Sequence, residues 1–294
     1  GADRRRPWRT LSLARRIDRL RLDRAFVLPG DTRAAFVPWL AGIPVRIGLH
    51  PGTRWGLINQ PHSALSADGT PLAAGALDRP AVERFVHLAF DPAQPLPGHV
   101  PNPVLVRDPG RETAALYRAG LVAETRVAAL CVGAEDGPAR RWPARHWAGL
   151  VTMLAEAQPS LQPVLLGAPS DRDFATEVAA LSGGSALNLC GSLSLAHTIA
   201  LVGRAEAVVA HDCGLMHVAA AFSRPMVAVF GPTDPRYAPP RSPRAKVTWL
   251  HQSCSPCKQP VCPLGHGQCL AGVRPESVFE SLASTARFAT RDIR

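Results

Sequence analysis

"VVAHDCGLMHVAAAFSRPMVAVFGPTDP", residues 208–235, is the stretch that decides the fold of this chain. An apolar run leads into a polar junction, a helical pattern of small residues follows, and a second apolar run comes after it. This order is typical of a strand, a turn, a helix and the next parallel strand. The stretch therefore predicts a βαβ unit whose first strand-to-helix junction carries His211, Asp212 and Gly214.

The same alternation extends over residues 125–231. Strands are expected at 126–132, 163–167, 186–190, 207–211 and 226–231, and helices at 144–158, 171–182, 194–204 and 214–223. Short apolar strands that alternate with amphipathic helices favour right-handed crossovers. The pattern predicts an α/β fold with a doubly wound parallel sheet.

The first third of the chain is less regular but is also of the α/β type. Strands are expected at 23–30 and 44–50, helices at 32–42 and 80–90, a Pro-rich linker at 93–110, and a last helix at 274–288. We predict two lobes. The first covers residues 1–110 with the linker from about 93, and the second covers residues 111–294.

Length and composition fit a soluble protein with two cores. The chain has 294 residues, 46% of them hydrophobic, which suffices for two domains of ordinary size. No apolar run approaches the roughly eighteen residues of a membrane span. The start, "GADRRRPWRT", lacks the apolar middle of a signal peptide, so nothing here directs export.

The net charge of +10 comes mostly from arginine, and arginines cluster between residues 4 and 24. One interpretation is an anionic partner such as nucleic acid, a phosphorylated lipid or an acidic glycan; the other is a solvated basic helix. Aromatic residues make up 6% of the chain, and no known nucleic-acid module accompanies the charge. We therefore expect no nucleic-acid partner.

The junction after residue 210 has both a binding and a structural interpretation. Ligands of open parallel sheets bind at the carboxyl ends of the strands, where Gly214 would allow close approach to the amides that open a helix. Asp212 would accept hydrogen bonds from sugar hydroxyls or cap the helix. His217, one turn further on, would reach a phosphate or fill a polar pocket. The residues alone leave these alternatives open.

Four cysteines crowd into one loop: Cys254, Cys257, Cys262 and Cys269, with His266 nearby. They supply enough soft ligands for a tetrahedral zinc site, although the spacing is less regular than that of paired CxxC motifs. The alternative is a Pro- and Gly-rich loop of reduced thiols. We expect no metal site, and zinc stays the open alternative.

The wider pattern of residues 211–235 resembles the signature of the lipopolysaccharide heptosyltransferases, glycosyltransferase family nine. That signature is an Asp, a small residue, Gly-Leu, His-x-Ala-Ala, Arg-Pro and Gly-Pro-Thr. Three further stretches are similar to the family: "VGAEDGPARRWPARHWAGL", "DRAFVLPGDTRAAFVPWLAGIPVRIGL" and "CSPCKQPVCPLGHGQCL". The resemblance implies a GT-B fold of two Rossmann-like lobes in a Gram-negative protein. It also implies inverting transfer of L-glycero-D-manno-heptose from ADP-heptose to heptosylated Kdo–lipid A.

The resemblance also implies which residues bind the donor. The expected set is Gly133, Ala134, Arg140, Asp171, Leu193, Asp212, Gly214, Leu215 and His217. The loop from Gly133 to Arg140 would approach the diphosphate, with Arg140 where the family usually has Lys. Asp212 would contact the sugar, and the start of the following helix would face the phosphates.

Some of these positions have equally plain structural interpretations. Asp171 would contact the ribose or cap the next helix, and Leu193 would pack on adenine or lie in the core. Arg140 would otherwise be surface charge. Arg33 matches a basic position on the acceptor side, and would otherwise be an ordinary exposed helical residue.

The catalytic base of the family is an Asp in a Gly-containing loop after the first strand of the amino-terminal lobe. Residues 1–60 contain no such segment, so the base is expected upstream of Gly1 and the lobe is expected to lack its first strands; Asp31 is a weak substitute. We expect no cofactor, an anionic lipid A–Kdo acceptor, and a monomer that works in the cytoplasm, peripherally at the inner membrane. Two alternatives are a transferase with another donor, such as UDP-N-acetylglucosamine, and a non-catalytic nucleotide-sugar-binding fragment.

Overall fold

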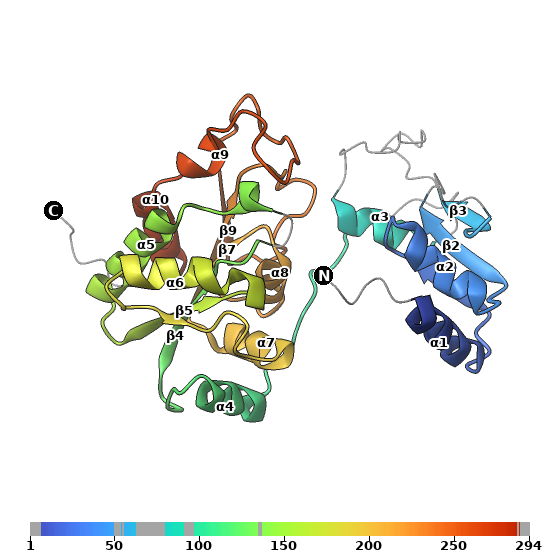
Figure 1. Cartoon of the computed structure of the whole chain (residues 1–294), viewed down its shortest axis with the longest axis horizontal. Helices are drawn as coiled ribbons and strands as arrows, with labels where there is room; N and C mark the ends of the chain where they lie inside the picture. Colours follow the sequence, from blue (N-terminus) through green and yellow to red (C-terminus); the bar gives the residue numbers. More distant parts are fainter. Residues whose placement is uncertain are drawn as a thin grey trace. The chain divides into compact units, whose positions relative to one another are not determined.

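The computed structural model describes residues 7–49, 54, 56–62, 80–90, 97–134, 137–286 and 288. The chain divides into two compact units, Gly1–Val100 with Arg236–Ala238 and Pro101–Pro235 with Pro239–Arg294 (Figure 1). Both units contain parallel β-sheet, and each is described separately below.

The larger unit is built on a six-stranded parallel sheet in the order β6-β5-β4-β7-β8-β9. Its strands are β4 (Arg126–Cys131), β5 (Leu161–Leu166), β6 (Leu187–Asn188), β7 (Ala207–His211), β8 (Met226–Phe230) and β9 (Ala245–Trp249). The chain adds strands to one side of β4 and then returns to add the rest on the other side. The order therefore reverses between β4 and β7, as in a Rossmann fold.

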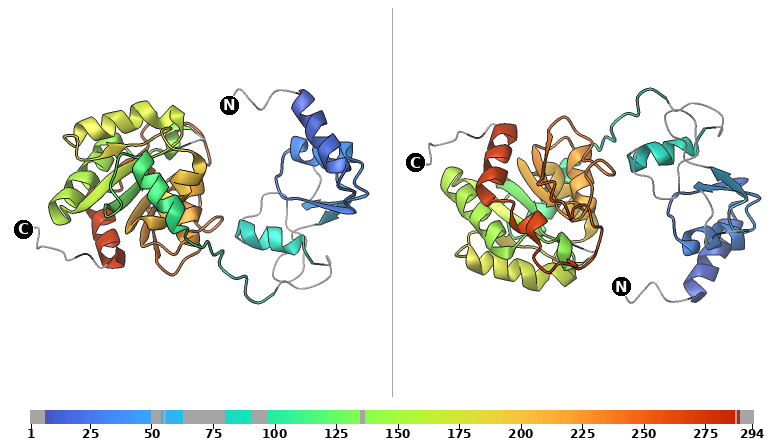
Figure 2. Two further views of the ribbon diagram at one scale, coloured as in Figure 1. Left: turned by 90° about the horizontal axis from the view of Figure 1, so that it is seen from below. Right: turned by 90° about the horizontal axis from the view of Figure 1, so that it is seen from above.

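Helices cover both faces of this sheet (Figures 1 and 2). They are α4 (Pro109–Arg118), α5 (Ala144–Ala157), α6 (Arg172–Leu181), α7 (Leu195–Arg204), α8 (Gly214–Ala221), α9 (Gln268–Ala271) and α10 (Pro275–Ala286), with 3₁₀ turns η3 (Pro138–Arg140) and η4 (Pro169–Asp171). Buried side chains of α5, α6 and α10 join one core cluster, and those of α4, α7 and α8 join the other.

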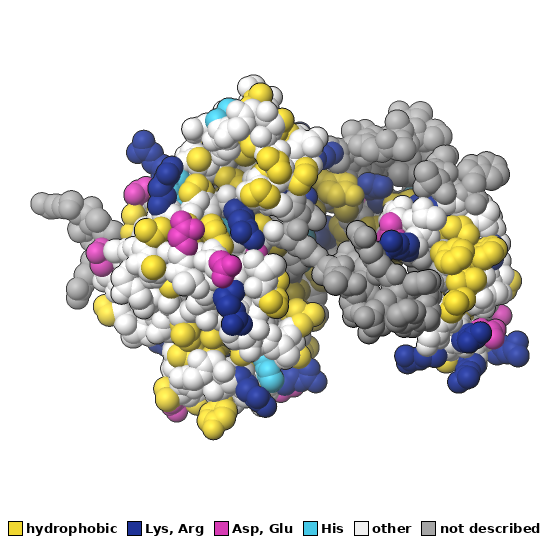
Figure 3. All heavy atoms as spheres, in the orientation of Figure 1, with side chains coloured by type: hydrophobic (Ala, Val, Ile, Leu, Met, Phe, Trp, Pro, Cys, Tyr) yellow, Lys and Arg dark blue, Asp and Glu magenta, His cyan; other side chains and the backbone are white. Residues whose placement is uncertain are grey.

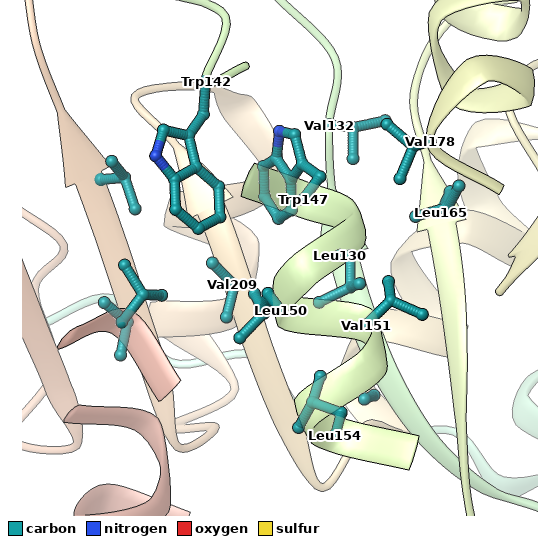
Figure 4. Packing of buried hydrophobic residues seen from close by; sticks show 14 of the residues in the cluster. Leu130, Val132, Trp142, Trp147, Leu150, Val151, Leu154, Leu165, Val178 and Val209 are labelled. Carbon is teal, nitrogen blue, oxygen red and sulfur yellow. The ribbon is translucent and has the colours of Figure 1, made fainter. Parts of the chain in front are cut away.

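Alternation along β4 explains these two cores. Leu130 contributes to the cluster under α5, whereas Ala129 and Cys131 contribute to the opposite cluster. All three side chains are fully buried, as expected for a strand of a parallel sheet covered on both faces. Figure 4 shows the first cluster, in which Trp142 and Trp147 pack above Leu150 and Val209.

The larger unit begins at Pro101, ten residues before the predicted start of the second lobe at 111. Leu105 N–H donates to the carbonyl of Ala221 in this unit, at 2.9 Å. Helix α4 begins at Pro109, and its N-cap Asp108 accepts from Arg111 N at 3.1 Å. Its buried Ala115 and Leu116 join the core under α7. The second half of the Pro-rich linker thus belongs to the larger unit.

The smaller unit contains a three-stranded parallel sheet in the order β1-β2-β3 among its described residues. Its elements are α1 (Pro7–Asp18), β1 (Arg24–Val27), α2 (Thr32–Leu40), β2 (Val45–Leu49), β3 (Gln60–His62) and α3 (Ala81–His87). Asp31 caps α2, because its Oδ1 accepts from Ala34 N at 2.9 Å. Tyr237 joins this unit by accepting a hydrogen bond from Ala81 N at 2.7 Å.

Candidate functional site

Two loops of the larger unit meet where the strand order reverses. One follows β4 and contains η3, and the other joins β7 to α8. Arg140 Nη1 lies 3.7 Å from Asp212 Oδ2 across this point. The two side chains are 24% and 19% exposed, so a bound molecule can reach both. Crevices at such switch points are the usual ligand sites of open parallel sheets.

The structure changes the interpretation of Asp212. The N-cap residue of α8 is Cys213, not Asp212, and the Asp212 carboxylate faces Arg140 instead. Helix capping therefore does not explain this acid. An ion pair of this length and exposure contributes only about 0–1 kcal/mol to stability, so a ligand can replace it at little cost.

The start of α8 is open. Gly214 is exposed, and a Cβ built on it has no described atom within 4 Å. Leu215 is half-buried, and His217 is exposed one turn into the helix. Partial burial of its ring lowers the pKa of His217, whereas the nearby Asp212 carboxylate raises it. The first amides of a helix have no intrahelical acceptor, so this end suits an anion.

Asp171 is directed inward. It is 3% exposed, and its carboxylate accepts from Arg141 Nη2 at 2.6 Å and from Ala168 N at 2.9 Å. Asp171 is the N-cap residue of α6, but its side chain makes no capping bond to that helix and instead accepts from the N-cap amide of η4. A Cβ on Gly133 would lie 2.8 Å from Asp171 Oδ2, which shows how closely the loops after β4 and β5 approach. Asp171 thus braces Arg141 and the loop beside it.

The remaining predicted residues are spread over both units. Ala134 is buried next to Gly133, and Leu193 is half-buried against the core cluster of α7 and α8. Arg33 is an exposed residue in the first turn of α2, in the smaller unit. The structure therefore places the donor-side set in the larger unit, with Arg140 and Asp212 in direct contact.

The four-cysteine loop connects two of the strand-end loops. We call residues 250–269, which follow β9 and include the first two residues of α9, the cysteine strap. Lys258 N donates to Pro232 O at 2.8 Å after β8, and the carbonyl of Pro260 accepts from Ala139 N at 3.0 Å in η3. A cavity of about 340 Å³ lies between η3 and the strap, lined among others by Pro138 and His266. The strap thus links η3 to the loop after β8 through these two backbone hydrogen bonds.

The strap cysteines are free thiols in the structure. Among the described residues, no group of three or more His, Cys, Asp or Glu side chains is arranged to hold a metal ion. The sulfur of Cys262 accepts from Gly267 N at 3.4 Å, and this bond lowers the pKa of Cys262. Burial raises the pKa of Cys269. The prediction of no metal site stays a prediction, and zinc stays its alternative.

Comparison with known proteins decides the family. The model of glycosyltransferase family 9 (heptosyltransferase) matches residues 10–267. The chain belongs to this family. It is 36% identical over 271 residues to lipopolysaccharide heptosyltransferase 2 of Escherichia coli K12, covering 89% of this chain and 75% of the relative. It is 32% identical over 273 residues to lipooligosaccharide heptosyltransferase 2 of Haemophilus influenzae, covering 88% and 75%.

Solved structures of family 9 show the same fold. The structure of E. coli ADP-heptose LPS heptosyltransferase II matches with a TM-score of 0.78 at 33% identity, over 96% of this chain and 81% of that one. A family 9 glycosyltransferase from Veillonella parvula matches in fold, with a TM-score of 0.72 at 17% identity over 95% and 78%. The α/β, GT-B-type prediction is confirmed.

Three buried polar residues at strand ends of this family 9 protein received no site role from the sequence. Asp234 and Thr233 are 4% and 8% exposed in the loop after β8, and His211 is 1% exposed at the end of β7. Ligands of parallel sheets bind at the carboxyl ends of the strands. This principle selected Asp212, and it applies equally to the loop after β8. His211 contacts a loop some seventy residues earlier in the chain, and no pattern in the neighbouring sequence indicates that contact. In the described part of the chain, no helix has the length and apolarity to cross a membrane.

Proposed function

We propose that this family 9 glycosyltransferase transfers L-glycero-D-manno-heptose from ADP-heptose to the inner core of lipopolysaccharide. The observation that carries the proposal is the Arg140–Asp212 pair beside the open start of α8. A nucleotide sugar presents a diphosphate next to sugar hydroxyls. A cation, an acid and the N-terminus of a helix within one crevice match that sequence of groups.

In this scheme the donor breaks the weak Arg140–Asp212 ion pair and binds both side chains. Asp212 accepts hydrogen bonds from the heptose hydroxyls, while Arg140, the amides from Gly214 onward and His217 face the diphosphate. Leu215 and Leu193 supply apolar contacts beside it. Arg140 and the helix start provide positive charge, so the proposal includes no metal ion or other cofactor.

The acceptor half of the proposal rests on the smaller unit. Arg15, Arg16, Arg19 and Arg21 are exposed on and just after α1, and Figure 3 shows dark blue side chains gathered at α1. Arg33 adds a further exposed cation on α2. Such a surface suits the phosphates and carboxylates of a Kdo–lipid A acceptor at the cytoplasmic face of the inner membrane. The monomeric state stays a prediction.

Titration calorimetry tests the donor assignment. The chain is titrated with ADP-heptose, ADP and UDP-N-acetylglucosamine under identical conditions, and Asp212→Asn is titrated in parallel. We expect ADP-heptose to bind most tightly, and Asp212→Asn to lose the advantage of ADP-heptose over ADP because its side chain has lost its charge. Tighter binding of the UDP-sugar would contradict the donor assignment. Mass spectrometry of heptosylated Kdo–lipid A incubated with donor and chain then tests transfer itself.

Gly214→Ala tests whether the donor approaches the backbone of α8. A Cβ at this position meets no described atom, and Ala is favoured over Gly in a helix, so thermal stability is expected to stay constant or rise. The methyl group would nevertheless occupy space that a diphosphate needs. We expect the Kd for ADP-heptose to rise about tenfold, or about 1.4 kcal/mol.

The matched control is Gly98→Ala, whose Cβ also meets no described atom and which lies in the smaller unit. This control is expected to leave both the thermal stability and the Kd for ADP-heptose unchanged. An unaltered Kd in Gly214→Ala would show that the donor does not contact this helix start.

A further inference from the structure

His211 is a buried titratable residue that the donor scheme does not use. It ends β7 and is 1% exposed. Its Nε2 accepts a hydrogen bond from the backbone N–H of Trp142, at 2.8 Å. An amide can donate only to an unprotonated ring nitrogen, so this bond requires the neutral ring with its proton on Nδ1.

The surroundings of the ring keep it neutral. Burial lowers the pKa of His211 to about 4, and Arg141 adds to that effect. The Gly133 backbone and Asp171 favour the charged ring more weakly. Nδ1 has no hydrogen-bond partner of good geometry among the described residues, so the Trp142 amide is the directional contact that the ring makes there. The acceptor nitrogen is therefore available throughout the physiological pH range.

The bond crosses the point where the strand order reverses. His211 belongs to β7, whereas Trp142 follows η3 in the loop after β4. His211 immediately precedes Asp212, and Trp142 lies two residues after Arg140. One buried hydrogen bond thus joins the two chain segments that present the Arg140–Asp212 pair.

Trp142 is itself rigidly held, which makes it a suitable anchor. Its Nε1 donates to Val273 O at 2.9 Å, and its ring packs edge-to-face on Trp147 with centroids 5.0 Å apart. Trp147 also packs against His211, at 5.1 Å. Figure 4 shows both tryptophans within the core cluster. Trp142 therefore links His211 to a fixed point of the loop after β4, two residues from Arg140.

We propose that His211 is a positioning residue of the donor site: through the Trp142 amide it fixes the η3 loop so that Arg140 stands opposite Asp212. The inference rests on the proposed function, because it assigns a task within that donor site. It differs from a packing role, which would contribute to stability without setting donor affinity.

Two substitutions separate positioning from packing. His211→Gln keeps a side-chain oxygen that can accept from the Trp142 amide, whereas His211→Phe keeps a ring and loses the acceptor. Wild type and both variants are titrated with ADP-heptose at pH 7.5, and their melting temperatures are recorded. We expect His211→Phe to raise the Kd at least fivefold and His211→Gln to stay within about twofold of wild type.

A Kd within twofold of wild type in His211→Phe, with a lowered melting temperature, would overturn the proposal in favour of packing. Equal losses of affinity in both variants would overturn it too, since the acceptor would then be irrelevant. If His211→Phe does not fold, His211→Leu, which also lacks the acceptor, takes its place in the comparison.

The wild-type titration keeps this inference distinct from the donor assignment. If wild type prefers another nucleotide sugar, the donor assignment fails, and the variants are then compared with that ligand, for which the same ratios are expected. If wild type binds none of the three nucleotides, both the proposed function and the positioning role are overturned.

Discussion

Replacing Gly137 with Ala is expected to loosen the cysteine strap, to lower the stability of the larger unit and to weaken donor binding. Gly137 has φ +114° and ψ 169°, a conformation that only glycine adopts readily. A Cβ there would lie 2.4 Å from the carbonyl oxygen of Pro260, which is the atom that accepts from Ala139 N. The backbone of either the strap or η3 must therefore move.

The expected fall in melting temperature follows from the backbone strain at residue 137 and from its steric contact with Pro260. Backbone strain of this kind costs about 1–3 kcal/mol, and about 1 kcal/mol shifts the melting temperature of a unit this size by about 2–4 °C. We expect a fall of about 5–10 °C by calorimetry, on that scale. Because Arg140 N bonds to Gly137 O at 3.2 Å, the shift also displaces Arg140. The Kd for ADP-heptose should rise about tenfold or more, which corresponds to about 1.4 kcal/mol.

Gly184→Ala is the matched control. Gly184 also has a positive φ, +79°, but its Cβ would meet no described atom within 4 Å. This variant carries the conformational cost of about 1 kcal/mol without the steric contact, so a small fall in melting temperature and an unchanged Kd are expected. If both variants behave alike, the contact between Gly137 and the strap does not position η3.

The sequence predicted the sheet of the larger unit well because its strands are continuous apolar runs. β4, β7 and β8 are buried on both faces, and such strands stand out from the amphipathic helices between them. β9 was missed because it lies at the edge of the sheet and all of its residues are half-buried or exposed. The signal that identifies a central strand is absent from a strand of this kind.

Helix α4 was missed for a different reason. The Pro-rich composition of residues 93–110 indicated a linker, and Pro109 was counted as part of it. The same residue is favoured at the first position of a helix, after an N-cap such as Asp108. Local capping chemistry was therefore present in the sequence, and composition concealed it.

The site was predictable only in part. The strand-end rule and the resemblance to the family selected Asp212, Gly214 and Arg140, but the residues alone could not separate capping from binding. That distinction depends on Arg140, seventy-two positions before Asp212, which faces it across the reversal of strand order. Asp171 shows the opposite case, since its burial against Arg141 gives it a structural role that the sequence left open.

Arg140→Gln is expected to weaken ADP-heptose binding by ten- to a hundredfold, with little change in stability. A charge-assisted hydrogen bond to a phosphate contributes about 1.5–3 kcal/mol, which this substitution removes. The Arg140–Asp212 ion pair, 3.7 Å long and partly exposed, adds only about 0–1 kcal/mol to stability. Calorimetric titration and thermal unfolding of the same samples measure both effects.

Arg145→Gln is the control with the same change of charge. Arg145 is exposed in the first turn of α5, five residues beyond Arg140, so it tests whether net charge alone explains the loss. We expect its Kd to stay within about twofold of wild type, because physiological salt screens the field of an exposed charge over about 8 Å. Equal losses of affinity in both variants would mean that donor binding depends on the net charge of the larger unit and not on Arg140 itself. A selective loss in Arg140→Gln, abolished when the titrant is the uncharged nucleoside adenosine, would locate the diphosphate at the junction of β4 and β7.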